Sequence, residues 1–475
     1  MGGPWGPPDG LVAEGNGLPP GLDLVPCGFA WAKRFGSCPS GPHPPKGRRA
    51  GHHSVESMLR TILRFVEFLK WFSVALAVAA LAGTASAALL FSLEWATRWR
   101  EGHEWMLVLL PVAGFGVAWA YHRWGRSVER GNNLLIEEIN DPKALLPGRM
   151  APMIFVATVV SHLTGASVGR EGTAVQMGGS LADRLTRPFG LGPRERSVLV
   201  ACGVSAGFGS VFGVPLAGAI FGLEVLAVGH MRYDALFPCL IASLGGDWVA
   251  RAWGAHHAEY LVGEIPDFGP AGLFKAITAG ILFGLMALAF VTLTHTFGSW
   301  FKRLLPDSRW RAFWGGAALI FVAVLLGATA YLGLSLPLIS AAFTGGSKPW
   351  DFAAKTIFTT FSLGVGFKGG EVTPLFLVGA GLGATLAPLL ALPGPLLASM
   401  GFAAVFGAAA NTPLTALVMA FELFGAKAGV YAAIACVLAY LCSGHGGIYP
   451  AQKKGAKHFG RPPRRVPETG QGIRG

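Results

Sequence analysis

The strongest constraint on the fold is a series of long apolar runs that carry almost no charge. Residues 72–93 form an uncharged run that is long enough to cross a bilayer as a helix. Similar runs recur as far as residue 441, and the chain is only 13% charged, about half the charged fraction usual in soluble proteins. Sixty-eight glycines suit close helix packing and interrupted helices in lipid. We therefore predict an all-α polytopic membrane protein.

Two terminal segments flank this apolar part. Residues 1–57 are dense in Gly, Pro and His, which predicts a disordered extension and makes Met58 an alternative start of the protein. Residues 453–475 are basic and predict a cytoplasmic tail. Most of the net charge of +12 lies in these two segments, so the positive-inside tendency places both termini in the cytoplasm, and no nucleic-acid partner is expected. The six cysteines have no CxxC spacing, so no metal site is expected.

A short charged motif follows the apolar run of residues 152–168. Residues 169–173 read Gly-Arg-Glu-Gly-Thr, and a carboxylate at membrane depth is costly unless it faces a protein interior or a water-filled path. Glycines leave backbone N–H groups open to an anion, and a helix that begins there adds the positive end of its dipole. The motif therefore predicts a functional site at Glu171. The alternative is a loop glutamate paired with Arg170 at the membrane surface.

The second half of the chain repeats this pattern. At an offset of 200 residues, the shared positions are Gly169 and Gly369, Glu171 and Glu371, Thr173 and Thr373, and Gly179 and Gly379. The segments from Pro215 to Glu224 and from Pro413 to Glu422 match as well. Such weak symmetry between glycine-broken apolar segments indicates a transporter built from two repeats, about residues 58–253 and 270–452, with its substrate site near the midplane. The alternative is generic glycine-rich packing.

Two helix N-termini at one site favour an anion as the substrate over a cation. An ionised Glu171 would compete with that anion for the site, whereas a protonated Glu171 would leave it. A single carboxylate could in this way couple the movement of a proton to the movement of an anion.

These motifs, in this order, resemble the CLC family of chloride channels and proton-coupled anion antiporters over about residues 59–452. The matching segments are residues 169–179, residues 214–218 with Glu224, residues 369–374, residues 411–416 with Glu422, and Tyr449. The resemblance implies a membrane domain of residues 58–452 made of inverted repeats with broken and re-entrant helices. It also implies a homodimer with one anion pathway per subunit, and no nucleotide or metal cofactor.

Four departures from the family pattern resemble its fluoride-selective branch. Asn132 replaces a serine, Thr173 replaces a proline, Val372 after Glu371 replaces a phenylalanine, and Val225 stands where chloride/proton exchangers carry an internal glutamate. The resemblance therefore implies a fluoride/proton antiporter that expels cytoplasmic fluoride across the inner (plasma) membrane.

The resemblance also implies roles for individual residues. Glu171 becomes the gating glutamate, which competes with the anion and carries the proton. The residues expected around the anion are Asn132, Gly172, Val372, Thr373 and Tyr449. Glu371 is expected to assist the inward movement of protons or fluoride.

Each of these roles has a structural alternative. Asn132 could cap the helix that follows it, Tyr449 could be an interface tyrosine, and Glu371 could stitch a broken helix together by hydrogen bonding. For Glu224 and Glu422 we expect a structural role, as helix-end residues that face the cytoplasm or pair within the bundle.

Two competing functions follow from other features. An ordinary chloride channel or chloride/proton exchanger would be favoured by serine, proline and phenylalanine at positions 132, 173 and 372, which the chain lacks. An intramembrane hydrolase would need a glycine after Ser167, or a second histidine to complete a metalloprotease motif at His103-Glu104. We therefore expect a transporter and not an enzyme.

Overall fold

The computed structural model of the protein describes residues 50–444 and 446–453, with side chains from residue 58 onward. Of these described residues, those from 62 onward form one compact unit. The predicted tail lies outside the described residues except for Lys453, and so does the predicted extension except for residues 50–57. Those eight residues belong to the first helix, and no proline interrupts the chain between Pro45 and Pro111.

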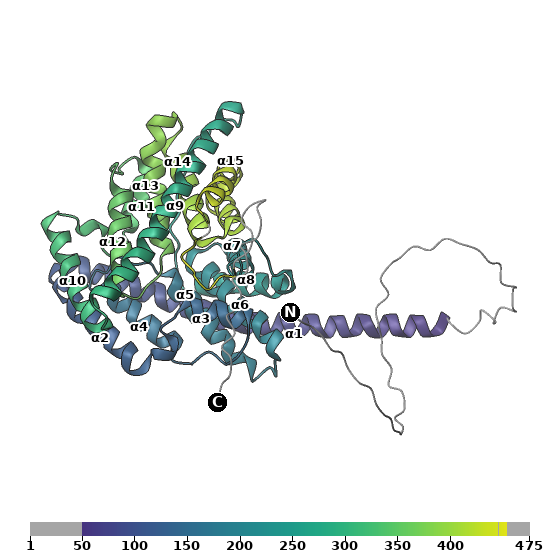
Figure 1. Cartoon of the computed structure of the whole chain (residues 1–475). Helices are drawn as coiled ribbons and strands as arrows, with labels where there is room; N and C mark the ends of the chain where they lie inside the picture. The colour runs from purple at the N-terminus through teal and green to yellow at the C-terminus, as the bar shows by residue number, and fades with distance from the viewer. Residues whose placement is uncertain (1–49, 445, 454–475) are drawn as a thin grey trace, which may run out of the picture. The chain divides into compact units, whose positions relative to one another are not determined.

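The described residues are almost entirely helical (Figure 1). In chain order the α-helices are α1 (Ala50–Gly102), α2 (Leu110–Trp124), α3 (Asn132–Asn140), α4 (Met150–Leu163), α5 (Glu171–Asp183), α6 (Pro193–Phe212), α7 (Pro215–Glu224), α8 (Leu236–Ala252), α9 (Pro270–Leu304), α10 (Ser308–Leu325), α11 (Leu336–Thr344), α12 (Asp351–Val365), α13 (Val372–Leu390), α14 (Gly394–Ala410) and α15 (Pro413–Cys442). The all-α fold is confirmed.

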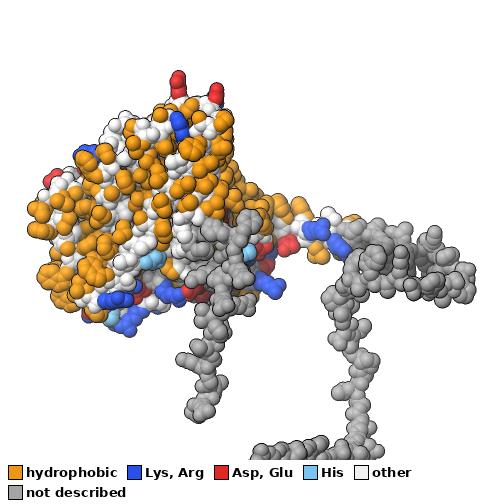
Figure 2. All heavy atoms as spheres, turned by 45° about the horizontal axis from the view of Figure 1, so that its top comes forward, with side chains coloured by type: hydrophobic (Ala, Val, Ile, Leu, Met, Phe, Trp, Pro, Cys, Tyr) orange, Lys and Arg blue, Asp and Glu red, His pale blue; other side chains and the backbone are white. Residues whose placement is uncertain are grey.

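Five helical segments are long and apolar enough to cross a membrane: the part of α1 from Met58, the segment Glu104–Trp124, α9, α13 and α15. Large apolar side chains are exposed on the outer helices, as on α10, where Trp314, Phe321 and Leu325 are each more than half exposed. Figure 2 shows hydrophobic side chains over most of the visible face of the compact unit, with charged side chains gathered toward its edges. This pattern is that of a surface that faces hydrocarbon.

One apolar run of the sequence contains more than one helical segment. Residues 313–334 read as one apolar segment, but α10 ends at Leu325, and a 3-10 turn (η5, Thr329–Tyr331) leads into the short helix α11. Gly327 and Gly333 adopt φ angles of +60° and +65°, which are left-handed conformations that break the helix.

The predicted broken helices lie at two equivalent places. The coil between α4 and α5 and the coil between α12 and α13 each follow a glycine with positive φ, Gly165 at +93° and Gly366 at +110°. The two coils then pair, because Gly169 N donates to Gly370 O at 2.6 Å and Gly370 N donates to Gly169 O at 2.8 Å. This pairing brings the N-termini of α5 and α13 together.

The repeat is present, but its register differs by one residue from the predicted offset of 200. Helices α5 and α13 begin at Glu171 and Val372, and the paired glycines are also 201 residues apart. Helix packing agrees: a Cβ on Gly178 would collide with the backbone of Gly203 on α6, and one on Gly379 with the backbone of Gly401 on α14. Glu171 therefore corresponds in space to Val372 and not to Glu371. The match of identical residues at an offset of 200 did not reveal this shift of one residue.

Two glutamates join the repeats reciprocally. Glu224, at the end of α7, accepts hydrogen bonds from Leu414 N (2.9 Å) and Thr415 N (2.8 Å) at the start of α15. Glu422 accepts from Leu216 N and Ala217 N, both at 2.7 Å, at the start of α7. Each carboxylate thus caps the opposite helix N-terminus, where negative charge is favourable. These contacts agree with the predicted pairing within the bundle.

Candidate functional site

The Glu171 carboxylate lies at the N-terminus of α13. The side chain is 1% exposed. Its Oε2 accepts hydrogen bonds from Thr373 Oγ1 at 2.7 Å and from Arg170 N at 2.9 Å, and its Oε1 accepts a short hydrogen bond from Val372 N. Charge-assisted bonds and the positive end of the α13 dipole both stabilise a negative group at this point. The carboxylate therefore lies where the start of α13 favours a negative charge.

Glycines on both sides of the site allow this close approach. A Cβ on Gly370 would lie 2.7 Å from Gly172 N, and one on Gly169 would lie 2.9 Å from Gly370 O. Any larger residue would force the two helix starts apart, and the Glu171 carboxylate would lose its contact with Val372.

The alternative of a surface ion pair between Glu171 and Arg170 does not match the contacts. The donor from Arg170 is its backbone N–H, and the guanidinium Nε is buried without a hydrogen-bond partner. Arg170 instead lines a cavity of about 910 Å³ that α1, α10 and residues 254–258 also line. The cavity thus reaches the residue next to Glu171.

Asn132 is the first residue of α3 and lies against the start of α5. A Cβ on Gly172 would lie 3.0 Å from Asn132 Nδ2, so Gly172 leaves the room that the amide occupies. Among the described residues, Asn132 Oδ1 is buried without a hydrogen-bond partner, and no side chain caps α3. The helix-capping alternative for Asn132 is therefore not what the contacts show.

Glu371 and Tyr449 complete the group. Glu371 immediately precedes α13, and its Oε2 is buried without a hydrogen-bond partner in the part of the chain that the structure describes. Tyr449 is 5% exposed and lies close enough to interact electrostatically with both Glu171 and Glu371. The site thus combines two carboxylates with a hydroxyl, in addition to the Thr373 hydroxyl and the Val372 N–H.

Thr173 makes a different contact from Thr373. Its hydroxyl lies 2.6 Å from the hydroxyl of Thr158 on α4 and ties α4 to α5. Proline at this position would lack that hydroxyl. Thr173, in place of the proline of the family pattern, therefore contributes to the packing of α4 against α5.

The sequence did not single out some buried polar side chains. Lys355 on α12 is fully buried, and its Nζ donates to Tyr331 O (3.0 Å), Gly333 O (2.7 Å) and Ser335 Oγ (2.9 Å). Asn133 and Gln452 likewise bond to distant segments. The sequence signal for Lys355 was a single basic residue inside α12. Asn133 and Gln452 carried no signal beyond their proximity to Asn132 and Tyr449 in the chain.

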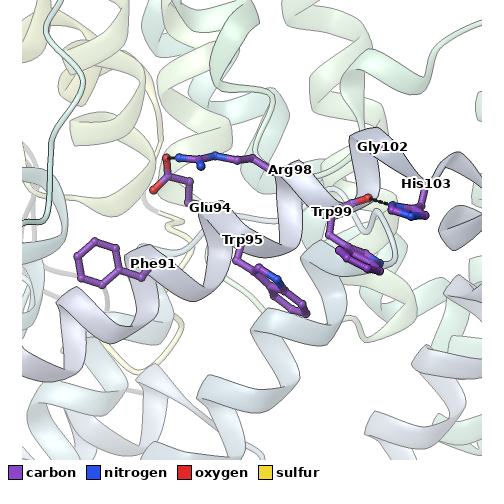
Figure 3. A pocket seen from close by; sticks show the side chains of 7 residues that line it. All are labelled: Phe91, Glu94, Trp95, Arg98, Trp99, Gly102 and His103. Carbon is purple, nitrogen blue, oxygen red and sulfur yellow. Dashed lines mark hydrogen bonds and ion pairs between the residues drawn. The ribbon is translucent and has the colours of Figure 1, made fainter.

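A second, more open pocket of about 340 Å³ lies along the C-terminal part of α1 (Figure 3). Its aromatic rings stack in a row, with Trp95 and Trp99 centroids 6.1 Å apart and Trp99 and His103 centroids 4.3 Å apart. Glu94 and Arg98 form an ion pair beside them. Exposed tryptophans with charged neighbours are typical of the membrane–water interface, and none of the predicted site residues lines this pocket.

Comparison with known proteins agrees with this arrangement. The family model described as "Voltage gated chloride channel" matches residues 113–444. A chloride/fluoride channel protein of Pseudomonas syringae pv. tomato is 54% identical over 399 residues, which cover 83% of this chain and 88% of that protein. The H(+)/Cl(−) exchange transporter ClcA of Yersinia pestis is 29% identical over 298 residues, 58% of this chain and 61% of that protein.

A solved structure, the crystal structure of a CLC-type fluoride/proton antiporter, matches with a TM-score of 0.80 at 33% identity, covering 82% of this chain and 99% of that one. A slow cyanobacterial Cl⁻/H⁺ antiporter matches with a TM-score of 0.67 at 21% identity, covering 79% of this chain and 94% of that one, and shares the fold. Because the family model covers more than half of the chain and the Pseudomonas relative most of it, the chain is a membrane protein of the CLC, or voltage gated chloride channel, family.

Proposed function

We propose that this protein is a fluoride/proton antiporter that exports fluoride from the cytoplasm. The observation that carries the proposal is the position of the Glu171 carboxylate, which accepts hydrogen bonds from Val372 N and Thr373 Oγ1 at the start of α13. The names of the Pseudomonas relative and of the antiporter of similar structure both include fluoride, which supports fluoride as the substrate.

Exchange follows from competition for this one position. While Glu171 is ionised, its carboxylate fills the N-terminus of α13 and blocks an anion from the same donors. Protonation removes the charge, so the donors favour an incoming anion over the neutral acid. When the proton leaves, the carboxylate returns and displaces the anion. Each cycle thus exchanges a proton against an anion in the opposite direction.

Asn132 and Tyr449 are the proposed source of fluoride preference. Fluoride is small and strongly hydrated, so a site that takes it from water must replace its hydration shell with close N–H and O–H donors. The Asn132 amide next to Gly172 and the Tyr449 hydroxyl near both carboxylates are such donors. A serine at position 132 would offer one hydroxyl donor where the amide offers two.

Glu371 is the proposed second proton carrier. Its Oε2 is buried without a partner and near Glu171, so a proton on Glu171 has a neighbouring acceptor. Glu224 does not serve that purpose, because three donors at the start of α15 already occupy its carboxylate. Val225, the next residue, has no titratable group.

A second candidate function is chloride transport, since a relative of lower identity is named as a proton/chloride exchanger. The departures at Asn132 and Val372 favour fluoride. In both cases we propose a homodimer with a separate pathway in each subunit, both termini in the cytoplasm, the inner (plasma) membrane as its location, and transport without catalysis or cofactor.

The proposal is tested with purified protein in liposomes loaded with fluoride or chloride. Ion-selective electrodes follow anion efflux, and a pH electrode follows protons in the same vessel. We expect fluoride efflux to exceed chloride efflux greatly and protons to move opposite to fluoride. Equal rates for the two anions would overturn fluoride as the substrate, and fluoride efflux without proton movement would overturn antiport.

A further inference from the structure

Tyr449 lies on a segment whose described residues, 446–453, form no helix. Backbone bonds fix the segment near its ends: Ile448 N donates to Ala409 O at 2.9 Å, and Lys453 N donates to Leu226 O at 3.2 Å. Because no regular helical hydrogen bonds hold the segment, the position of the Tyr449 hydroxyl also depends on side chains that bond this segment to its neighbours.

The Gln452 side chain is one such anchor. Its Nε2 donates to Val225 O at 3.0 Å and to Ala410 O at 2.9 Å, and its Oε1 accepts from Asn411 Nδ2 at 3.0 Å. The side chain is 7% exposed, and both donors and the acceptor of its amide are used. Gln452 thereby ties the Tyr449 segment to the C-terminal ends of α7 and α14.

Asn133 is the second anchor, and it connects the Tyr449 segment to the neighbour of Asn132. Its Oδ1 accepts a hydrogen bond from Ala451 N at 3.0 Å. Asn132 and Asn133 are consecutive residues at the start of α3. One hydrogen bond therefore spans the distance between the two elements that carry the Asn132 amide and the Tyr449 hydroxyl.

The opposite end of α3 is fixed independently. Glu138 pairs with Arg196 at 3.0 Å, and Arg196 also pairs with Asp183 at the end of α5 at 2.6 Å. Because this buried ionic group holds α3, a change at Asn133 acts on the Tyr449 segment more than on the helix.

We infer that Asn133 and Gln452 are positioning residues that set the spacing between the Asn132 amide and the Tyr449 hydroxyl, and thereby the preference for fluoride over chloride. The inference rests on the proposed function, in which these two groups bind the anion. Donors held close together suit a small ion, whereas donors free to separate also accommodate a larger one.

The test measures initial efflux of fluoride and of chloride from liposomes for the parent and for Asn133→Leu and Gln452→Met, which remove the hydrogen bonds at similar side-chain volume. Asn133→Asp keeps the Oδ acceptor and should restore the parent ratio. Thr356→Val is the control, because Thr356 is buried and its Oγ1 donates to Phe352 O at 2.7 Å within α12, not to the Tyr449 segment. Size-exclusion chromatography identifies variants that fold.

We expect Asn133→Leu, which loses one hydrogen bond, to lower the ratio of fluoride to chloride efflux about fivefold. Gln452→Met loses three hydrogen bonds and should lower this ratio at least as much. The fluoride KM should rise more than the maximal rate falls. An unchanged ratio in both variants, or an equal fall in Thr356→Val, would overturn the inference. If Gln452→Met does not fold, Asn133→Leu with its Asp rescue decides alone. Failure of the proposed function appears separately, as a parent protein without fluoride preference.

Discussion

The hydrogen bond from Thr373 should hold the Glu171 carboxylate at the start of α13. Thr373 Oγ1 donates to Glu171 Oε2 at 2.7 Å, and both side chains are buried. A hydrogen bond to a charged group contributes about 1.5–3 kcal/mol. Thr373→Val keeps the shape of the side chain and removes the donor, so it should weaken the docked state of the carboxylate by about that amount.

The Thr373 hydroxyl should also donate to the anion once Glu171 has left the site. A double-mutant cycle is therefore needed to isolate the bond between Thr373 and Glu171. Fluoride affinity is measured by isothermal titration calorimetry for the parent, Thr373→Val, Glu171→Ala and the double variant. In the Glu171→Ala background, Thr373→Val reports only the bond between Thr373 and fluoride. The difference between the two backgrounds reports the bond between Thr373 and the gate.

We expect this difference to correspond to a factor of about 10–150 in the dissociation constant. Thr373→Val should cost less fluoride affinity in the protein that keeps Glu171 than in the Glu171→Ala background, because it also weakens the binding of the competing Glu171 carboxylate. Thr373→Ser, which keeps the hydroxyl, should behave as the parent. A cycle that is additive to within about twofold would refute the claim that Glu171 competes with the anion at the start of α13.

Three further predictions concern selectivity and stability. Asn132→Ser should narrow the ratio of fluoride to chloride efflux, which ion-selective electrodes measure, and an unchanged ratio would argue against Asn132 as a fluoride donor. Arg196→Met should lower stability by about 3–5 kcal/mol, because it leaves the buried Asp183 carboxylate unpaired; thermal aggregation followed by size-exclusion chromatography measures this. Glu224→Gln should lower thermal stability through its cap on α15 but keep proton coupling, and loss of coupling would make Glu224 a proton carrier.

Much of the fold could be predicted from the sequence because lipid imposes strong constraints. Apolar runs and the absence of charge set the helical class, and glycines before Glu171 and Glu371 located the two helix breaks. The reciprocal caps were foreseeable as helix-end carboxylates at matching distances from Pro215 and Pro413. These features depend on local chemistry and on symmetry within one chain.

Other features depend on three-dimensional register, which residue identity does not reveal. The match of Glu171 with Glu371 was attractive because both are carboxylates, yet the pairing of Gly169 with Gly370 aligns Glu171 with Val372. The end of α10 at Leu325 was hidden within an apolar run. The anchoring bonds of Gln452 could not be predicted, because they join segments far apart in the chain, 227 residues in the case of Val225 O.

The most direct test of the central claim is proton movement driven by fluoride. Liposomes that contain the protein are loaded with fluoride, placed in fluoride-free buffer without a pH difference, and followed with a pH electrode. The parent should take up protons into the liposomes as fluoride leaves, and Glu171→Gln, which cannot carry the charge, should show none. Proton uptake that persists unchanged in Glu171→Gln would contradict the assignment of Glu171 as the group that exchanges a proton for the anion.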